Sequence, residues 1–184
     1  MKALKIVGII IAVLVVIAVA LVVFLPSHSH VERSIVINAQ PSRIFAELND
    51  FRNFNTWSPW ATLDPNTKYE YSGPETGVGA TMTWSSDDKK VGHGTQKIIE
   101  SQENVHVKNE MSFEGFDTMS YADFTLTPDG NGTKVTWAYD GDMSGLYKVF
   151  GLMMDGMLGP TFEKGLTRLK TAVESKPSVG QANP

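Results

Sequence analysis

Hydrophobic residues fill the start of the chain without interruption by a charge. Residues 6–25 read IVGIIIAVLVVIAVALVVFL, in which only Gly8 is not strongly apolar. Twenty helical residues extend about 30 Å, which matches the hydrocarbon core of a bilayer. The run therefore predicts a transmembrane helix. A cleaved signal peptide is the alternative, because Ala18-Val19-Ala20 resembles a cleavage site, although a signal sequence has only about 7–15 apolar residues.

Beyond this run the apolar positions change their spacing. Residues 31–37 read VERSIVI and alternate with period two, which predicts a strand rich in β-branched residues. Residues 41–48 begin with proline and carry apolar side chains at helical spacing, which predicts a helix. Asp50 is a suitable N-cap for a second short helix, and Pro59 predicts that this helix ends near Trp57.

The middle of the chain alternates repeatedly between short apolar-polar segments and turn residues. This pattern predicts an antiparallel meander, and a helix follows it because apolar residues recur at intervals of four, three and four. Pro160 is expected to kink or interrupt that helix. The predicted strands are TKYEYS (67–72), GATMTWS (79–85), GHGTQKIIES (92–101), NVHVKNEMSFE (104–114), TMSYADFTLTP (118–128) and TKVTWAYD (133–140), and the helical stripe is Phe162, Leu166, Leu169 and Val173.

Charge around the first apolar run predicts its orientation. Lys2 and Lys5 precede the run, and no charge follows it until Glu32. Because cytoplasmic flanks are enriched in Lys and Arg, we expect a single-pass membrane protein with a cytoplasmic N-terminus and a periplasmic or extracellular domain. The expected divisions are a cytoplasmic N-terminus (1–5), a transmembrane helix (6–25), a linker (26–30), one folded domain (31–175) and a disordered tail (176–184).

Composition excludes several functional classes. The net charge is −4 and no Lys/Arg cluster is present, so nucleic acid is not an expected partner. The absence of cysteine excludes disulfides, thiolate nucleophiles and cysteine metal sites. His28 and His30 form an H-x-H pair, but the predicted linker supplies no further zinc ligands. We therefore expect neither a metal nor a cofactor.

Four segments of the chain resemble a known family. They are VERSIVINAQPSRIFAELNDFRNFNTWSPW, YSGPETGVGATMTW, FTLTPDGNGTKVTWAYDGD and FEKGLTRLK. Together they resemble the SRPBCC superfamily, the START-like helix-grip proteins, in its polyketide cyclase/dehydrase-like branch. The resemblance covers nearly all of residues 31–174. It implies an α+β fold in which a curved antiparallel sheet of about seven strands surrounds a long C-terminal helix, with a cavity between them.

Alternation and the resemblance together predict the residues that line this cavity. The inward positions of the strands form an apolar wall, which the amide of Asn109 interrupts. His93, between two glycines, lies at the start of a predicted strand. The resemblance places the short helix pair at one end of the grip, so its tryptophans lie nearest the mouth. A Met-rich segment at 145–160 has four possible roles: a mobile lid over the cavity, ordinary core, a surface on lipid headgroups, or a protein contact. The candidate ligand-binding residues are Trp57, Trp60, Met82, Trp84, His93, Asn109, Met111, Phe124, Trp137, Phe150, Met153, Met154 and Met157.

Motifs of catalysis are absent from the sequence. No serine lies in a G-x-S-x-G turn, so a hydrolase is not indicated and no catalytic residue is assigned. The leading hypothesis is a membrane-tethered, extracytoplasmic domain that binds a small hydrophobic ligand such as a lipid or isoprenoid. One alternative is a cyclase or dehydratase that uses His93 or a carboxylate among Asp140, Asp142 and Asp155 as acid or base. The other is a protein-interaction module of the cell envelope, whose partner the sequence does not identify.

Overall fold

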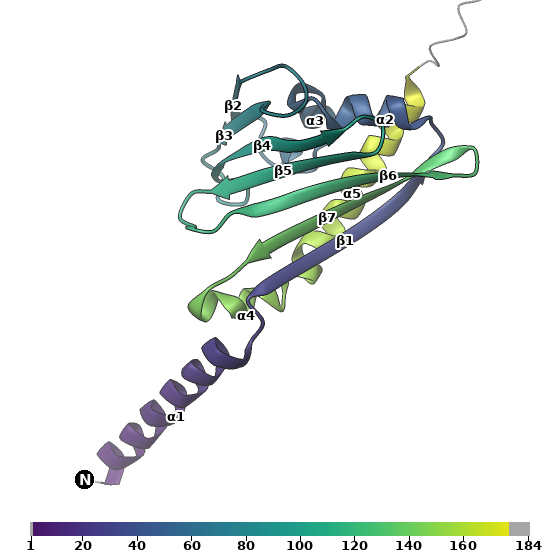
Figure 1. Ribbon diagram of the computed structural model, residues 1–184. Helices are drawn as coiled ribbons and strands as arrows, with labels where there is room; N and C mark the ends of the chain where they lie inside the picture. Colours follow the sequence, from purple (N-terminus) through teal and green to yellow (C-terminus); the bar gives the residue numbers. More distant parts are fainter. Residues whose placement is uncertain (1, 177–184) are drawn as a thin grey trace, which may run out of the picture.

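The N-terminal helix stands apart from the rest of the molecule. The computed structural model describes residues 2–176, so most of the predicted tail lies outside the described residues. Helix α1 (Lys2–Phe24) extends away from the domain (Figure 1). Its segment Leu4–Phe24 is long and apolar enough to cross a membrane, and none of it is buried against the domain. A helix of this kind near the N-terminus can be a membrane span or a signal sequence.

A single antiparallel sheet forms the body of the domain. Its seven strands lie in the order β1-β7-β6-β5-β4-β3-β2, so consecutive strands from β2 to β7 are neighbours and the predicted meander is confirmed. The strands are β1 (His28–Ile37), β2 (Lys68–Ser72), β3 (Thr81–Ser85), β4 (His93–Gln102), β5 (His106–Phe113), β6 (Ser120–Asp129) and β7 (Gly132–Asp142). β1 begins before residue 31 because its pairing with β7 extends to His28, opposite Asp142. His28 and His30 are therefore strand residues, although the sequence suggested a linker.

Short helices lie in two places, between β1 and β2 and between β7 and the long helix α5. α2 (Pro41–Leu48) and α3 (Phe51–Trp57) follow β1, and the 3₁₀ helix η1 (Trp60–Thr62) follows them. The carboxylate of Asp50 accepts a hydrogen bond from the Arg52 N–H at 2.8 Å, which confirms the predicted cap. After β7 come the 3₁₀ helix η2 (Gly145–Tyr147), α4 (Lys148–Gly151) and α5 (Met154–Ser175). Pro160 lies inside α5 without interrupting it.

Helix α5 lies against one face of the sheet, as Figure 1 shows. The four residues of the predicted stripe, Phe162, Leu166, Leu169 and Val173, are all almost completely buried. This is the helix-grip arrangement that the resemblance implied. The remaining core consists of inward side chains of the strands together with apolar residues of α2 and α3.

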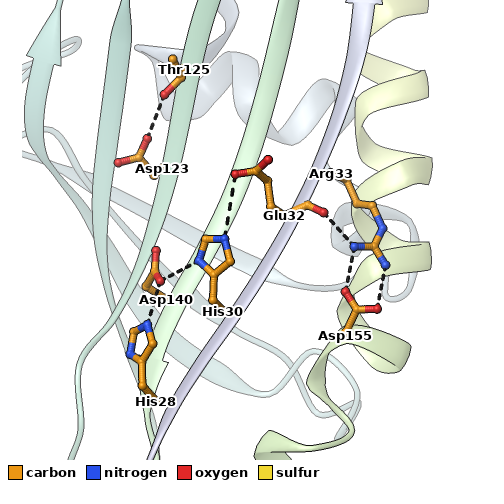
Figure 2. Close-up of polar contacts among 8 residues, drawn as sticks. All are labelled: His28, His30, Glu32, Arg33, Asp123, Thr125, Asp140 and Asp155. Atoms are coloured by element: carbon orange, nitrogen blue, oxygen red, sulfur yellow. Dashed lines mark hydrogen bonds and ion pairs between the residues drawn. The ribbon is translucent and has the colours of Figure 1, made fainter.

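An arginine of β1 holds the first half of α5 against the sheet. Arg33 donates two hydrogen bonds to the carboxylate of Asp155, at 2.7 and 3.0 Å, and its Nε donates to Glu163 at 3.0 Å. The guanidinium lowers the pKa of Asp155 below its ordinary value. Gly159 lies between these acids, and a Cβ there would approach Nη2 of Arg33 to 2.1 Å. Figure 2 shows the side chain of Arg33 on the face of β1 that is turned toward the helix, and the side chain of His30 on the other face.

Candidate ligand-binding cavity

A cavity of about 510 Å³ lies between the sheet and α5. Pockets that hold small molecules typically measure about 300–1,000 Å³, so the space is large enough for a ligand. Nine of the thirteen predicted site residues line it: Trp60, Met82, Trp84, His93, Asn109, Met111, Phe124, Trp137 and Met157. Seven of the nine come from β strands, Trp60 comes from the short helical turn at Trp60–Thr62, and Met157 comes from α5. Whether these residues contact a ligand stays a prediction.

Aromatic rings build the wall of the cavity on the side of α5. The indole of Trp137 stacks on the ring of Phe162 at 4.1 Å between centroids, with only 5° between the planes. The helix approaches this closely because Gly165 has no side chain; a Cβ there would lie 2.7 Å from the Trp137 ring. Phe124 and Trp60 contact the same indole, at 5.0 and 5.7 Å. The wall is therefore rigid and mainly apolar.

Two buried polar atoms on the cavity wall have no hydrogen-bond partner. They are Oδ1 of Asn109, an acceptor, and Nε1 of Trp137, a donor. Asn109 is only 1% exposed. An unpaired buried polar group costs about 1–3 kcal/mol, so most such groups in proteins are paired. Both atoms have almost no accessible surface, and Asn109 is the polar residue on an apolar face that the sequence singled out.

Four predicted site residues lie away from the cavity. Trp57 is completely buried behind the wall, where it packs edge-on against Phe124 at 6.1 Å, so it belongs to the core rather than to the mouth. Phe150 and Met153 point to the surface, because the α4 segment turns away from the sheet before α5 begins. Met154 packs against the edge of the core instead of lining the cavity.

Several lining residues were missed by the sequence analysis. Gln96 could have been found, because it shares the inward parity of Ile98 on β4 and pairs with Met111 on β5. Phe54 and Phe162 come from helices, where alternation does not apply. Lys89, Lys90 and Phe116 come from loops, and no local pattern predicted that these loops reach the cavity.

Ionisable groups near the cavity are few and mostly lie at its edge. Burial raises the pKa of the Tyr69 phenol above its ordinary value of 10.0, so this group is a neutral hydrogen-bond donor. A ring nitrogen of His93 lies 3.0 Å from the hydroxyl of Ser85. The carboxylates proposed as acid or base, Asp140, Asp142 and Asp155, are not among the residues that line the cavity.

A histidine-aspartate cluster occupies the opposite face of β1 and β7 (Figure 2). The ring nitrogens of His28 lie 3.0 Å from Asp140 and 3.2 Å from Asp142, and His30 lies 2.8 Å from Asp140. Cross-strand pairing brings these residues together, since His28 and His30 are opposite Asp142 and Asp140. Within residues 2–176, no group of three or more His, Asp or Glu side chains has an arrangement suited to a metal ion.

Stability is expected to depend on pH through His28. The hydrogen bonds to Asp142 and Asp140 raise its pKa above the ordinary value of 6.5. The protonated ring therefore stabilises the fold fully below pH 6.5, and this contribution is lost as the pH rises through the raised pKa. The pair is exposed, so we expect about 1 kcal/mol or less. The check is the difference in unfolding temperature between the wild type and His28→Gln, followed by tryptophan fluorescence from about pH 5.5 to 8.5.

Asp142→Asn provides the matched control for this prediction. It removes the first acceptor of His28 and leaves the histidine in place, so it should reduce the same pH-dependent difference. If the unfolding temperatures of His28→Gln and the wild type differed by the same amount at every pH, the prediction would be contradicted.

Comparisons with known proteins agree with the observed fold. The model of the family described as polyketide cyclase/dehydrase and lipid transport matches residues 28–174. A protein of Chromobacterium violaceum is 14% identical, with a TM-score of 0.60 over 80% of this chain and 99% of that one. A Thermobifida fusca protein is 17% identical, with a TM-score of 0.60 over 78% and 92%. The Aha1 dimer from Colwellia psychrerythraea is 19% identical, with a TM-score of 0.57 over 79% and 96%. A comparison with curated proteins finds no match.

Proposed function

Because the chain belongs to the polyketide cyclase/dehydrase and lipid transport family, we propose that it binds a small hydrophobic ligand, such as a lipid or an isoprenoid-like molecule, between the sheet and α5. The observation that carries this proposal is the cavity of about 510 Å³, whose wall is mainly apolar. An apolar ligand would remove this surface from water at a gain of about 25 cal/mol per Å² buried.

The unpaired atoms on the wall narrow the chemistry of the ligand. Oδ1 of Asn109 needs a donor and Nε1 of Trp137 needs an acceptor. An apolar molecule that carries a hydroxyl or another polar group is therefore the favoured ligand, because these two residues are polar positions on an apolar wall. A pure hydrocarbon would leave the two atoms unpaired and is disfavoured.

Helix α1 supports a location at the membrane. We propose that it is an uncleaved anchor with a cytoplasmic N-terminus, so that the domain is periplasmic or extracellular. The apolar run, the exposure of α1 and the lysines at positions 2 and 5 support this orientation. An anchor would keep the cavity close to membrane-derived ligands and raise their effective concentration.

Replacing Asn109 with leucine is expected to weaken ligand binding about tenfold or more without destabilising the protein. The change removes a buried, unpaired acceptor from the wall, and a ligand whose polar group meets the amide of Asn109 would lose that hydrogen bond, which costs about 1–3 kcal/mol. Native mass spectrometry of the full chain, released from detergent micelles, measures this loss directly with farnesol and oleic acid as probes.

Asn66→Leu, at an exposed loop position, is the matched control and should bind as the wild type does. If the wild type binds neither probe and carries no retained ligand from the membrane, the proposed function fails. Recovery of a dehydrated or cyclised product from added farnesol would instead favour the enzyme alternative.

The proposed orientation can be tested because the chain contains no cysteine. A single cysteine placed by Thr127→Cys, on an exposed position of β6, should react in intact cells with a maleimide that cannot cross the cytoplasmic membrane. Lys2→Cys should react only after the cells are permeabilised. The mass of the purified chain separates the anchor from the signal peptide, because cleavage near residue 20 would remove the first apolar run.

A further inference from the structure

The strand pairings gather several loops at one end of the domain. Ser85 pairs with His93, Met111 with Ser120, and Ser120 with Gly141. The β3–β4 loop, the β5–β6 loop and the end of β7 therefore lie at the same end of the sheet. His28 pairs with Asp142, so the start of β1, and with it the anchor, is at this end too. Figure 1 shows α1 leaving the domain beside α4.

Exposed apolar side chains are concentrated at this end. Within residues 25–176, thirteen large apolar side chains are exposed, and eight of them lie on the β5–β6 loop or between η2 and the first turn of α5. Contacts between Phe116 and Tyr147, at 6.0 Å, and between Tyr147 and Phe150, at 6.2 Å, join the two regions. We name this surface the apolar rim; it consists of Phe116, Met119, Leu146, Tyr147, Phe150, Leu152, Met153 and Met157.

The mouth of the cavity lies at the same end. The lining residues that are exposed to solvent mark where the cavity opens, and the deep ones, such as Asn109 and Trp137, are buried. Two residues of the apolar rim, Phe116 and Met157, are also part of the lining. The exposed lining residues are Lys89, Lys90, His93, Glu114, Phe116 and Met157.

The last turn of α1 contacts the η2–α4 segment, which carries part of the apolar rim. Nζ of Lys148, on α4, donates a hydrogen bond to the carbonyl oxygen of Val22 in the last turn of α1, at 2.8 Å. Only residues 25–27 separate α1 from β1, and Ser27 accepts a hydrogen bond from the N–H of Met143 at 2.7 Å. Three residues span about 10 Å at most, so the domain cannot move far from the end of α1.

We propose that the apolar rim docks on the bilayer in which α1 is anchored, so that the cavity opens toward the membrane and its ligand enters from the lipid phase. This inference rests on the proposed anchor and ligand-binding function. The bilayer is the favoured occupant because the rim is continuous with the helix that would span it. The aromatic and methionine side chains of the rim suit the boundary between headgroups and acyl chains, where docked apolar surfaces lie about 5–10 Å deep.

Apolar contact is expected to dominate over charge at this surface. The β3–β4 loop carries Lys89 and Lys90 beside Asp87 and Asp88, and the β5–β6 loop adds Glu114 and Asp117. With Lys148 on α4 as the third basic residue, these acidic side chains outnumber the basic ones. Docking should therefore survive about 0.5 M salt, which screens exposed charges within a few ångströms. Release of the rim by salt would overturn the apolar basis of the proposal.

The test uses single-cysteine variants of the full chain, labelled with the fluorophore NBD and reconstituted into phosphatidylcholine/phosphatidylglycerol vesicles. Phe116→Cys and Leu152→Cys report on the rim, because both side chains are exposed and their replacement spares the core. Doxyl groups attached near the headgroup end of the acyl chains should quench both labels at least about twofold more than doxyl groups near the chain ends, as a shallow site requires.

Two further positions make the result decisive. A label at Val15→Cys, within α1, verifies insertion, and one at Thr127→Cys, at the far end of β6, should not be quenched. Absence of quenching at both rim positions while the label in α1 is quenched would overturn the proposal. A rim label that is unquenched in vesicles but blue-shifted in native membranes would identify a protein as the occupant, which also overturns it.

The outcome for docking is independent of the outcome for ligand binding. Quenched rim labels in a chain that retains no ligand would support docking and remove the proposed function. Bound farnesol or oleic acid in a chain with unquenched rim labels would support the proposed function and overturn docking. The double substitution Leu152→Ser and Met153→Ser should slow the uptake of oleic acid from vesicles at least about threefold. Val36→Ser removes an exposed apolar side chain of β1 outside the rim and should leave the uptake rate unchanged.

Discussion

Replacing Trp137 with alanine is expected to lower the free energy of unfolding by about 3–5 kcal/mol, the range for truncating a large buried aromatic residue. The indole contacts five other rings and is only 2% exposed, so its removal would extend the existing cavity into the core. The contact with Phe162 also joins β7 to α5, so the substitution would remove one of the contacts between the sheet and its helix. Urea unfolding of the full chain in detergent, followed by circular dichroism, gives the measurement.

Trp84→Ala is the matched control for this result. Trp84 also lines the cavity, but it is partly exposed and contacts one ring, that of Phe113 at 5.6 Å. We expect a smaller loss than for Trp137→Ala. Equal losses for the two variants would show that the stacking with Phe162 adds nothing to the sheet-helix contact.

Replacing Ala122 with tryptophan is expected to weaken ligand binding by about 10- to 100-fold. Ala122 lies on β6 and lines the cavity, so a large side chain there would occupy the space of the ligand. For the ligand to bind, the new tryptophan would have to move aside, which would cost about 1–3 kcal/mol, as overpacking does. Each 1.4 kcal/mol corresponds to a tenfold change in the dissociation constant. The stability of the empty protein should fall far less than in Trp137→Ala, because the new ring fills an existing cavity. Titration with oleic acid, read by native mass spectrometry, gives the affinity.

Thr127→Trp is the control for the added ring. Thr127 is exposed and lies on the same strand, on the face opposite Ala122, so the substitution adds the same side chain without entering the cavity. Unchanged affinity in Ala122→Trp would place the ligand outside the cavity and would remove the basis of the proposed function.

Strand alternation predicted the wall of the cavity well. Met82, Met111, Phe124 and Trp137 face inward because successive side chains of a strand point to opposite faces, and this depends only on local spacing. The stripe of α5 was predictable for the same reason, with a period of 3.6. Asn109 stood out because a polar residue interrupted an apolar face, and the structure leaves its Oδ1 unpaired.

Other features of the site depend on contacts between segments that are distant in the sequence, and the spacing of apolar residues does not show these contacts. Trp57 and Trp60 are both aromatic and three residues apart, yet the first is in the core and the second lines the cavity, because Pro59 ends the helix between them. His28 and His30 were expected in a linker, because nothing in residues 26–30 indicates the pairing with β7. For the Met-rich segment the sequence left a lid, ordinary core, a surface on lipid headgroups and a protein contact open, and spacing alone did not show that Phe150 and Met153 are exposed on the side of α1.

The contact between Arg33 and α5 has a mechanical consequence for the entrance of the cavity. Arg33 lies on the strand that follows α1, and its partner Asp155 lies two residues before Met157 at the cavity mouth. The proposed anchor is therefore linked through β1 and this guanidinium to the first turn of α5. A change in bilayer thickness, which alters the tilt of a membrane helix, would reach the entrance by the same route.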